Sequence, residues 1–225
     1  MMARVLLCCI VVALLRTDRS VRWYHWLRQS SGYTPLHRRT FEYDRIDPHV
    51  WLGRQPRDAQ DVHALRHAGI GAILCFTQPW EEYVPPDVYR TYAFERLALP
   101  VCDFGAPTAA QVDEGMAFLR RNRTRGVYVH CNAGRGRSGV MAVAYYIATY
   151  VDPSLAAAAI ATEAIQQVRR RRPALSTLID YYPITAQARA VRAYATHHRR
   201  SAAAHSRGTP RGAAIGANPT ILEST

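Results

Sequence analysis

The sequence contains no lysine, no Cys-x-x-Cys pair and no internal repeat. All 29 of its basic residues are arginine, a bias that we attribute to codon composition and from which we infer no function. Its five cysteines are an odd number, and none has the spacing of zinc ligands. These absences argue against a disulfide framework and a structural zinc site, and they favour a reducing compartment.

Long hydrophobic runs are also missing, since the run Val5–Leu15 has only 11 residues. A helix needs about 20 apolar residues to span a bilayer, so this run does not anchor the chain by itself. The segment that follows is rich in arginine, and Asp18 is the only acid before Glu42, which is typical of mitochondrial targeting segments. A secretory signal is the alternative, but no clean A-x-A site follows. We therefore expect residues 1–42 to be a targeting or membrane-proximal segment.

The net charge of +12 is spread unevenly over the 225 residues. Residues 1–42 carry +5, residues 43–195 carry +4, and the remainder carries +3. The central region is only mildly basic, which argues against nucleic acid as a partner. Small and polar residues with scattered proline and glycine follow residue 196. We expect one folded domain over 43–195 and a disordered tail over 196–225.

Hydrophobic patterns in the central region alternate between those of strands and those of helices. Short apolar runs predict strands at 70–76, within 92–99 and at 127–130. Helices are expected at 58–67, from a capping box at Thr108 to Arg121, over 138–150, and from 152–154 to the arginines at 169–172. This alternation indicates an α/β layered fold.

The segment 130–139 joins the third strand to the most apolar helix, and it carries the chemistry. Its backbone N–H groups and the start of the helix make an anion site, and Gly134 and Gly136 let the backbone close around a phosphate. Cys131 lies among these donors, so we expect its pKa to fall below the free value of about 8.5. The planar guanidinium of Arg137 can bind two phosphate oxygens, a geometry that lysine lacks.

This run resembles the H-C-x5-R-S signature of the cysteine-dependent protein tyrosine phosphatase superfamily, in its dual-specificity branch. The resemblance implies a single α/β domain with a mixed, largely parallel central sheet flanked by helices. It implies a nucleophilic Cys131 that forms a phosphocysteine and an Arg137 that clamps the phosphate. Ser138 would ease departure of the thiolate, and His130 would hold the loop and tune the thiol. The phosphate would be bound by the loop residues Asn132, Ala133, Gly134, Arg135 and Gly136.

The leaving oxygen needs a proton, which this superfamily takes from an aspartate on a movable loop. Asp103 is the only acid between Leu97 and the helix that starts at Thr108. We expect Asp103 to act as general acid and later as general base, with an exposed turn aspartate as the alternative. No metal or other cofactor is required, because the loop and the arginine supply the charge stabilisation.

A narrower resemblance concerns the substrate. The stretch Glu42–Pro56 resembles the entry strand of dual-specificity phosphatases. More narrowly, three groups of residues are similar to the mitochondrial phosphatidylglycerophosphate phosphatase family, which acts at the matrix side of the inner membrane in cardiolipin synthesis: Arg45–Pro48 with Leu52 and Gly53, Trp80–Tyr83, and Arg172, Pro173 and Leu175. This match implies a substrate loop made of Glu81, Glu82 and Tyr83. Two departures are present. Val84 replaces the last acid of the family's E-E-Y-E, and Asn132 replaces the usual basic residue after the nucleophile, which leaves Arg135 to favour a polyanionic headgroup.

Three functions stay open on the sequence alone. The first is a mitochondrial phosphatase of phosphatidylglycerophosphate, with a phosphoinositide as a variant substrate. The second is a dual-specificity protein phosphatase, and the third is a phosphate-binding pseudophosphatase without turnover. The partner is accordingly a phosphorylated anionic lipid or a phosphoprotein, and the alternative locations are the endoplasmic reticulum and the cytoplasm. The arginines at 169–172 predict either a peripheral contact with an anionic membrane or simply favourable cations at a helix C-terminus.

Overall fold

The computed structural model describes residues 20, 22–23 and 40–208. The sequence-based predictions for the leader and for residues beyond 208 lie outside these residues, apart from positions 20, 22, 23 and 40–42. The strands are β1 (Tyr43–Arg45), β2 (Val50–Arg54), β3 (Ala72–Cys75), β4 (Glu95–Ala98) and β5 (Val127–Cys131). The helices are α3 (Ala59–His67), α4 (Pro86–Thr91), α5 (Ala109–Arg121), α6 (Arg137–Tyr150), α7 (Ala157–Arg171) and α8 (Ala186–Gly208), with short 3-10 turns η2 (Pro79–Glu81), η3 (Arg123–Arg125) and η4 (Thr177–Asp180).

The five strands form one mixed sheet in the order β1-β2-β5-β3-β4. The edge strand β1 is antiparallel to β2, and the remaining pairs are parallel. The predicted α/β fold with a mixed, largely parallel sheet is therefore confirmed. Parallel strands bring their carboxyl ends to one edge, where ligand sites of such sheets form. The register places Cys131 of β5 beside Arg54 of β2, and His130 beside Cys75 of β3.

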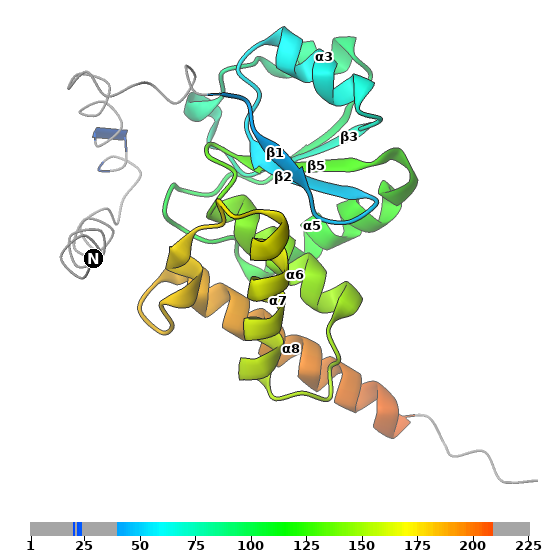
Figure 1. Ribbon diagram of the computed structural model, residues 1–225, viewed down its shortest axis with the longest axis vertical. Helices are drawn as coiled ribbons and strands as arrows, with labels where there is room; N and C mark the ends of the chain where they lie inside the picture. The colour runs from blue at the N-terminus through cyan, green and yellow to red at the C-terminus, as the bar shows by residue number, and fades with distance from the viewer. Residues whose placement is uncertain (1–19, 21, 24–39, 209–225) are drawn as a thin grey trace, which may run out of the picture.

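Helices cover both faces of the sheet (Figure 1), and alternate side chains of each strand pack against different helices. Leu74 and Val129 point into the larger core, which they share with α5, α6, α7 and α8. Ile73 and Tyr128 point to the opposite face, into the smaller core that includes residues of α3 and α4. Strands buried on both faces need apolar residues at every position, which explains the continuous apolar runs of β3 and β5.

The predicted central helix is α6, whose first eleven residues are all buried. It follows directly on the loop after β5, so its N-terminus lies at the ligand-binding edge of the sheet. The start of α7 differs from the sequence-based prediction, which placed it at 152–154. Asp152 accepts a hydrogen bond from the backbone N–H of Ser154 at 2.8 Å in a separate turn, and the helix begins only at Ala157. A short polar side chain can cap a local turn as readily as a helix.

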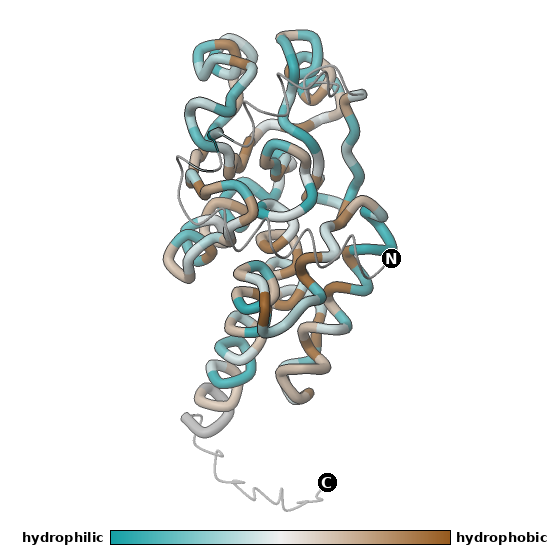
Figure 2. Tube along the Cα trace, turned by 90° about the vertical axis from the view of Figure 1, so that its left-hand side faces the viewer, coloured by the Kyte–Doolittle hydropathy of each residue, from teal (hydrophilic) through white to brown (hydrophobic). Residues whose placement is uncertain are grey.

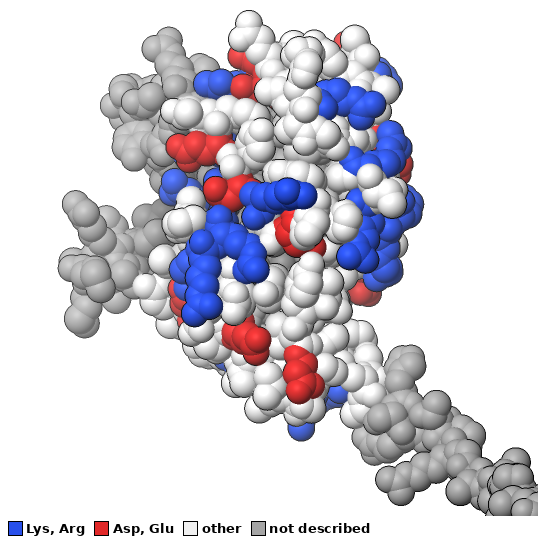
Figure 3. Space-filling model, turned by 45° about the vertical axis from the view of Figure 1, so that its right-hand side comes forward, with Lys and Arg blue, Asp and Glu red and all other residues white. Residues whose placement is uncertain are grey.

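The prediction of a disordered tail from residue 196 was wrong for residues 196–208, because α8 continues to Gly208. Buried Val191 and Ala195 anchor the helix on the core. The following residues are rich in alanine and arginine, which favour helix once a helix has been nucleated. The C-terminal part of α8 projects beyond the rest of the described domain, and its colours in Figure 2 are hydrophilic to intermediate. On the face shown in Figure 3, arginines and acids lie side by side.

Candidate active site

The loop between Cys131 and Arg137 lies against the end of β2. Gly134 has a φ of +64°, and a Cβ atom there would lie 2.1 Å from the backbone of Gly53, so this position requires glycine. Its carbonyl accepts a hydrogen bond from Nε of Arg172 at 3.2 Å. The loop is thus held from two sides in the tight curve that aims its backbone at one centre.

Cys131 ends β5 with its side chain at the base of this loop, and only 3% of the residue is exposed. The Ser138 hydroxyl donates a hydrogen bond to its Sγ at 3.2 Å. Burial alone would raise the pKa of the thiol. The charge of Arg137 and the hydrogen bonds from Ser138 and from the backbone N–H of Arg135 outweigh burial, so the pKa of Cys131 lies below its ordinary value. The site therefore favours a thiolate, as expected from the sequence.

Arg137 is buried at the start of α6, and its guanidinium is fixed by two carboxylates. It donates to Glu81 through Nη1 at 2.6 Å and Nη2 at 2.9 Å, and Nη2 lies 3.1 Å from Oδ1 of Asp103. Nη1 also donates to the carbonyl of Val101 at 2.9 Å. Burial alone would lower the pKa of Arg137. The two carboxylates raise the pKa by more than burial lowers it, so the guanidinium stays charged. The arginine is thus oriented by protein groups before a phosphate is present.

Asp103 lies on the loop between β4 and α5, and its side chain is 23% exposed. Oδ1 accepts a hydrogen bond from the backbone N–H of Phe104 at 3.0 Å. Phe104 has a φ of +62°, an uncommon conformation for a residue with a side chain. The expected acid is therefore beside the clamp, on a tight turn rather than free in solvent.

The side chains of the three residues in the predicted substrate loop contact different partners. Glu81 is the bidentate partner of Arg137 and is buried. Tyr83 donates its hydroxyl hydrogen bond to Oδ1 of Asn132 at 3.4 Å, and burial followed by the charge of Glu81 raises the pKa of Tyr83 to about 12. Glu82 turns away from the loop and pairs with Arg96 on β4. The segment 81–83 therefore supports the phosphate loop with two of its three side chains.

Asn132 stands in the loop at the position where a basic residue is usual, and its side chain is engaged in hydrogen bonds. Its Oδ1 also accepts a hydrogen bond from Nε2 of Gln55 at 3.2 Å, and its Nδ2 donates to Glu81 at 3.4 Å. Gln55 donates in turn to the carbonyl of Glu81 at 2.9 Å. Sequence reasoning missed Gln55, whose one signal is its position directly after a strand at the ligand-binding edge.

His130 is fully enclosed between strands and stacks on Tyr128 with ring centroids 5.7 Å apart. Burial and then the charge of Arg96 lower the pKa of His130 to about 3, so the ring is neutral at physiological pH. His130 is therefore a neutral, buried side chain directly before the loop, and its expected role in holding the loop and tuning the thiol stays a prediction. Of the other loop residues, Ala133 and Gly136 are half-buried and Arg135 is exposed.

The four arginines at 169–172 do not form one surface. Arg172 is buried and joins Gly134 to Asp44, whose Oδ2 lies 2.6 Å from its Nη1. Arg169 pairs with Asp180 at 2.8 Å, and Arg171 lies over the ring of Tyr146. A membrane-facing patch that includes Arg172 is therefore wrong, because this residue is a structural support of the phosphate loop. Within the described ranges, no group of three or more His, Cys, Asp or Glu side chains is arranged to hold a metal ion.

The comparisons with known proteins agree with this geometry. Residues 45–179 match the family described as "PTP-SAK: Swiss Army Knife protein, DSP-PTPase phosphatase domain". The chain therefore belongs to this family of cysteine-dependent phosphatases, and the assignment made from the loop signature is confirmed.

Individual relatives narrow the resemblance further. The chain is 34% identical to the Arabidopsis thaliana phosphatidylglycerophosphate phosphatase PTPMT2 over 108 residues. This matched region covers 47% of each of the two chains. It is 31% identical over 126 residues to the human phosphatidylglycerophosphatase and protein-tyrosine phosphatase 1, which covers 53% of this chain and 63% of that one. The chain thus spans about half to two thirds of these proteins. The crystal structure of PTPMT1 superposes with a TM-score of 0.60 at 25% identity, over 72% of this chain and 99% of that one.

Proposed function

We propose that this protein hydrolyses the phosphomonoester of phosphatidylglycerophosphate, an anionic phospholipid, through a phosphocysteine intermediate. The observation that carries the proposal is the contact between two segments that lie far apart in the sequence. The Glu81–Tyr83 stretch, on which the likeness to lipid phosphatases rests, contacts the nucleophile loop through the Arg137–Glu81 pair and the Tyr83–Asn132 hydrogen bond. The lipid phosphatases among its relatives support the same substrate.

The geometry supports two displacements at phosphorus. The Cys131 thiolate attacks the phosphorus atom, the bond from phosphorus to the glycerol oxygen breaks, and Asp103 donates the proton that this oxygen takes up. Arg137 and the backbone N–H groups of the loop stabilise the equatorial oxygens. A water then attacks phosphorus while Asp103 accepts its proton, and the phosphorus–sulfur bond breaks. The hydrogen bond from Ser138 stabilises the departing thiolate, and free phosphate leaves.

The substrate class is tested by comparing turnover with the purified full chain. Phosphate release is measured with phosphatidylglycerophosphate, with a phosphoinositide, and with phosphotyrosine and phosphothreonine peptides. We expect kcat/KM for phosphatidylglycerophosphate to exceed that for the peptides by about tenfold or more, a difference of about 1.4 kcal/mol in transition-state stabilisation. Peptides that react more than tenfold faster would establish a protein phosphatase. Binding of phosphate without turnover of any substrate would establish a pseudophosphatase.

Replacing Asp103 by Asn should slow hydrolysis of the lipid phosphate by about 10²-fold, because an alkyl leaving oxygen needs the donated proton. An activated aryl phosphate needs it less, so its turnover should fall much less. The matched control is Asp113→Asn at an exposed position of α5, which should leave both rates unchanged. Equal losses for the two substrates in the Asp103 variant would remove this residue from the acid role.

The proposed location is the matrix side of the mitochondrial inner membrane, on the strength of the arginine-rich leader. This segment lies almost entirely outside the described residues. In the described part of the chain, none of the helices has the length and apolar character needed to cross a bilayer. Fusing residues 1–42 to a fluorescent reporter should direct it to mitochondria, and secretion of the reporter would contradict this location.

A further inference from the structure

The connection between η4 and α8, residues Tyr181–Thr185, presents apolar side chains to solvent. Tyr182 is 52% exposed and Ile184 is 65% exposed, and Pro183 between them is also exposed. Among the described residues, the other exposed large hydrophobic side chains are Trp23, at 61%, and Tyr150, at 46%. Two such side chains within three residues form a local apolar tip. We call residues 181–185 the docking loop.

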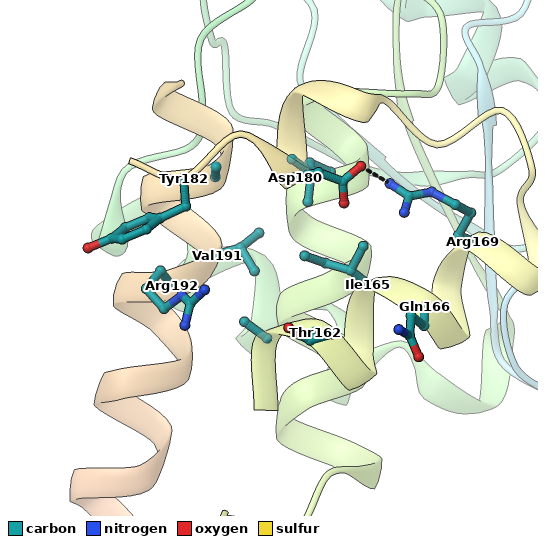
Figure 4. Close-up of a pocket in the computed structure, with 11 residues that line it drawn as sticks. Thr162, Ile165, Gln166, Arg169, Asp180, Tyr182, Val191 and Arg192 are labelled. Carbon is teal, nitrogen blue, oxygen red and sulfur yellow. Dashed lines mark hydrogen bonds and ion pairs between the residues drawn. The ribbon is translucent and has the colours of Figure 1, made fainter. Parts of the chain in front are cut away.

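The docking loop is held in place, so its exposure is a property of the fold. Nη1 of Arg189 donates to the carbonyls of Pro183 at 2.9 Å and Ile184 at 2.8 Å. The guanidinium of Arg192 lies over the Tyr182 ring, 4.9 Å from its centroid. Figure 4 shows Tyr182 directed outward above Arg192 of α8, beside the cavity between α7, η4 and α8.

The segments that flank the docking loop contact the phosphate site. Gln187, in the first turn of α8, packs against Gly136 of the phosphate loop and donates a hydrogen bond to the carbonyl of Gly105, near Asp103, at 3.2 Å. The backbone N–H of Ser176 donates to the carbonyl of Arg135 at 3.0 Å. The segments on both sides of the docking loop are therefore tied to the two loops that carry the catalytic groups. These contacts connect the docking loop through its flanking segments to the loops of Cys131 and Asp103.

The charged side chains that contact the docking loop are arginines, Arg189 and Arg192 of α8. The acid that directly precedes the loop, Asp180, is paired with Arg169. The exposed Arg135 of the phosphate loop adds to this charge. An exposed apolar tip flanked by the arginines of α8 matches the surface of a bilayer that contains anionic lipids, into which apolar side chains insert while cations contact the headgroups.

We propose that the docking loop inserts Tyr182 and Ile184 into an anionic lipid surface and thereby holds the phosphate site against the headgroup of its substrate. The inference rests on the proposed lipid substrate, which it deepens by assigning a membrane-binding surface. It also relocates the membrane contact from the arginines at 169–172, of which Arg172 is buried, to the loop that follows them.

The test compares the double variant Tyr182→Ser, Ile184→Ser with the wild-type full chain. Binding is measured by sedimentation with vesicles of phosphatidylcholine, with and without phosphatidylglycerol. The wild type should bind only the anionic vesicles, and increasing salt should weaken this binding. The double variant should bind them about tenfold more weakly or worse, since it loses the apolar area of two side chains. Turnover of lipid phosphate in vesicles should fall in parallel, while turnover of a water-soluble aryl phosphate stays within twofold.

Tyr150→Ser is the matched control, because Tyr150 is 46% exposed but lies at the far end of α6. Thirteen residues of helix place it about 20 Å from the start of that helix. This variant should bind vesicles as the wild type does. Unchanged vesicle binding by the double variant, or equal binding to neutral and anionic vesicles, would overturn the proposal. Because binding is measured without turnover, a chain that binds vesicles but hydrolyses only phosphopeptides would refute the proposed substrate and leave the docking surface intact.

Discussion

Replacing Cys131 by Ser should abolish hydrolysis, with a loss in kcat of about 10⁵-fold or more, while phosphate binding is retained. A serine hydroxyl is not ionised by the charge that suffices for a thiol, so the nucleophile is lost. The loop backbone and Arg137, which bind the phosphate, remain in place. The measurement is phosphate release together with binding of inorganic phosphate or vanadate by calorimetry. Residual activity near the wild-type level would show that another group attacks phosphorus.

Cys75→Ser is the matched control for this prediction. Cys75 is also buried at the end of a neighbouring strand, but burial raises the pKa of its thiol, and its Sγ lies 2.7 Å from Oγ1 of Thr77. The variant should keep wild-type kcat. Iodoacetamide should accordingly modify Cys131 rapidly near neutral pH and leave Cys75 unmodified in the folded protein, because the thiolate is the reactive form.

The lowered pKa of Cys131 also fixes the sign of the pH dependence. Only the thiolate attacks, so kcat/KM should stay high as pH falls below the ordinary thiol range and should decline only through the lowered pKa.

The stability of the fold depends on pH separately and must be measured at each pH. The folded-state pKa of His130, about 3, lies below its unfolded value of about 6.5, so the unfolded state binds the extra proton. Stability is therefore lost progressively as pH falls from about 6.5 toward 3.

The candidate site residues that lie close together in the sequence were predictable. Cys131, Arg137 and Ser138 lie on a single loop, and its glycines, its preceding strand and its following helix are all local signals. The expected strands and most helices were equally local, because apolar periodicity reports burial of one element at a time. The position of Asp103 beside Arg137 was predictable because no other acid lies in its loop, and its role as general acid stays a prediction.

The supports of the loop were not predictable in the same way. Glu81 contacts Arg137 across 56 positions of sequence, and Asp44 contacts Arg172 across 128. Such pairs depend on strand order and on how far each loop reaches, which no local pattern encodes. The run of four arginines therefore left a membrane-facing patch open as one of two interpretations, although burial separates Arg172 from the rest. The extent of α8 was missed for a related reason, since its last turns depend on nucleation by a packed segment before them.

Replacing Arg137 by Lys should reduce kcat for any phosphomonoester by about 10³-fold. Lysine keeps the positive charge that the buried Glu81 and Asp103 require, so the fold should survive, as thermal melting will show. It cannot donate two parallel hydrogen bonds to Glu81 while presenting others to the phosphate, because its ammonium is a point donor and not a planar fork. Arg96→Lys is the matched control, since Arg96 also pairs with a glutamate, the neighbouring Glu82, but through one contact and away from the loop. It should retain kcat within a few-fold, and an Arg137→Lys variant that does the same would show that the guanidinium geometry is not needed for phosphoryl transfer.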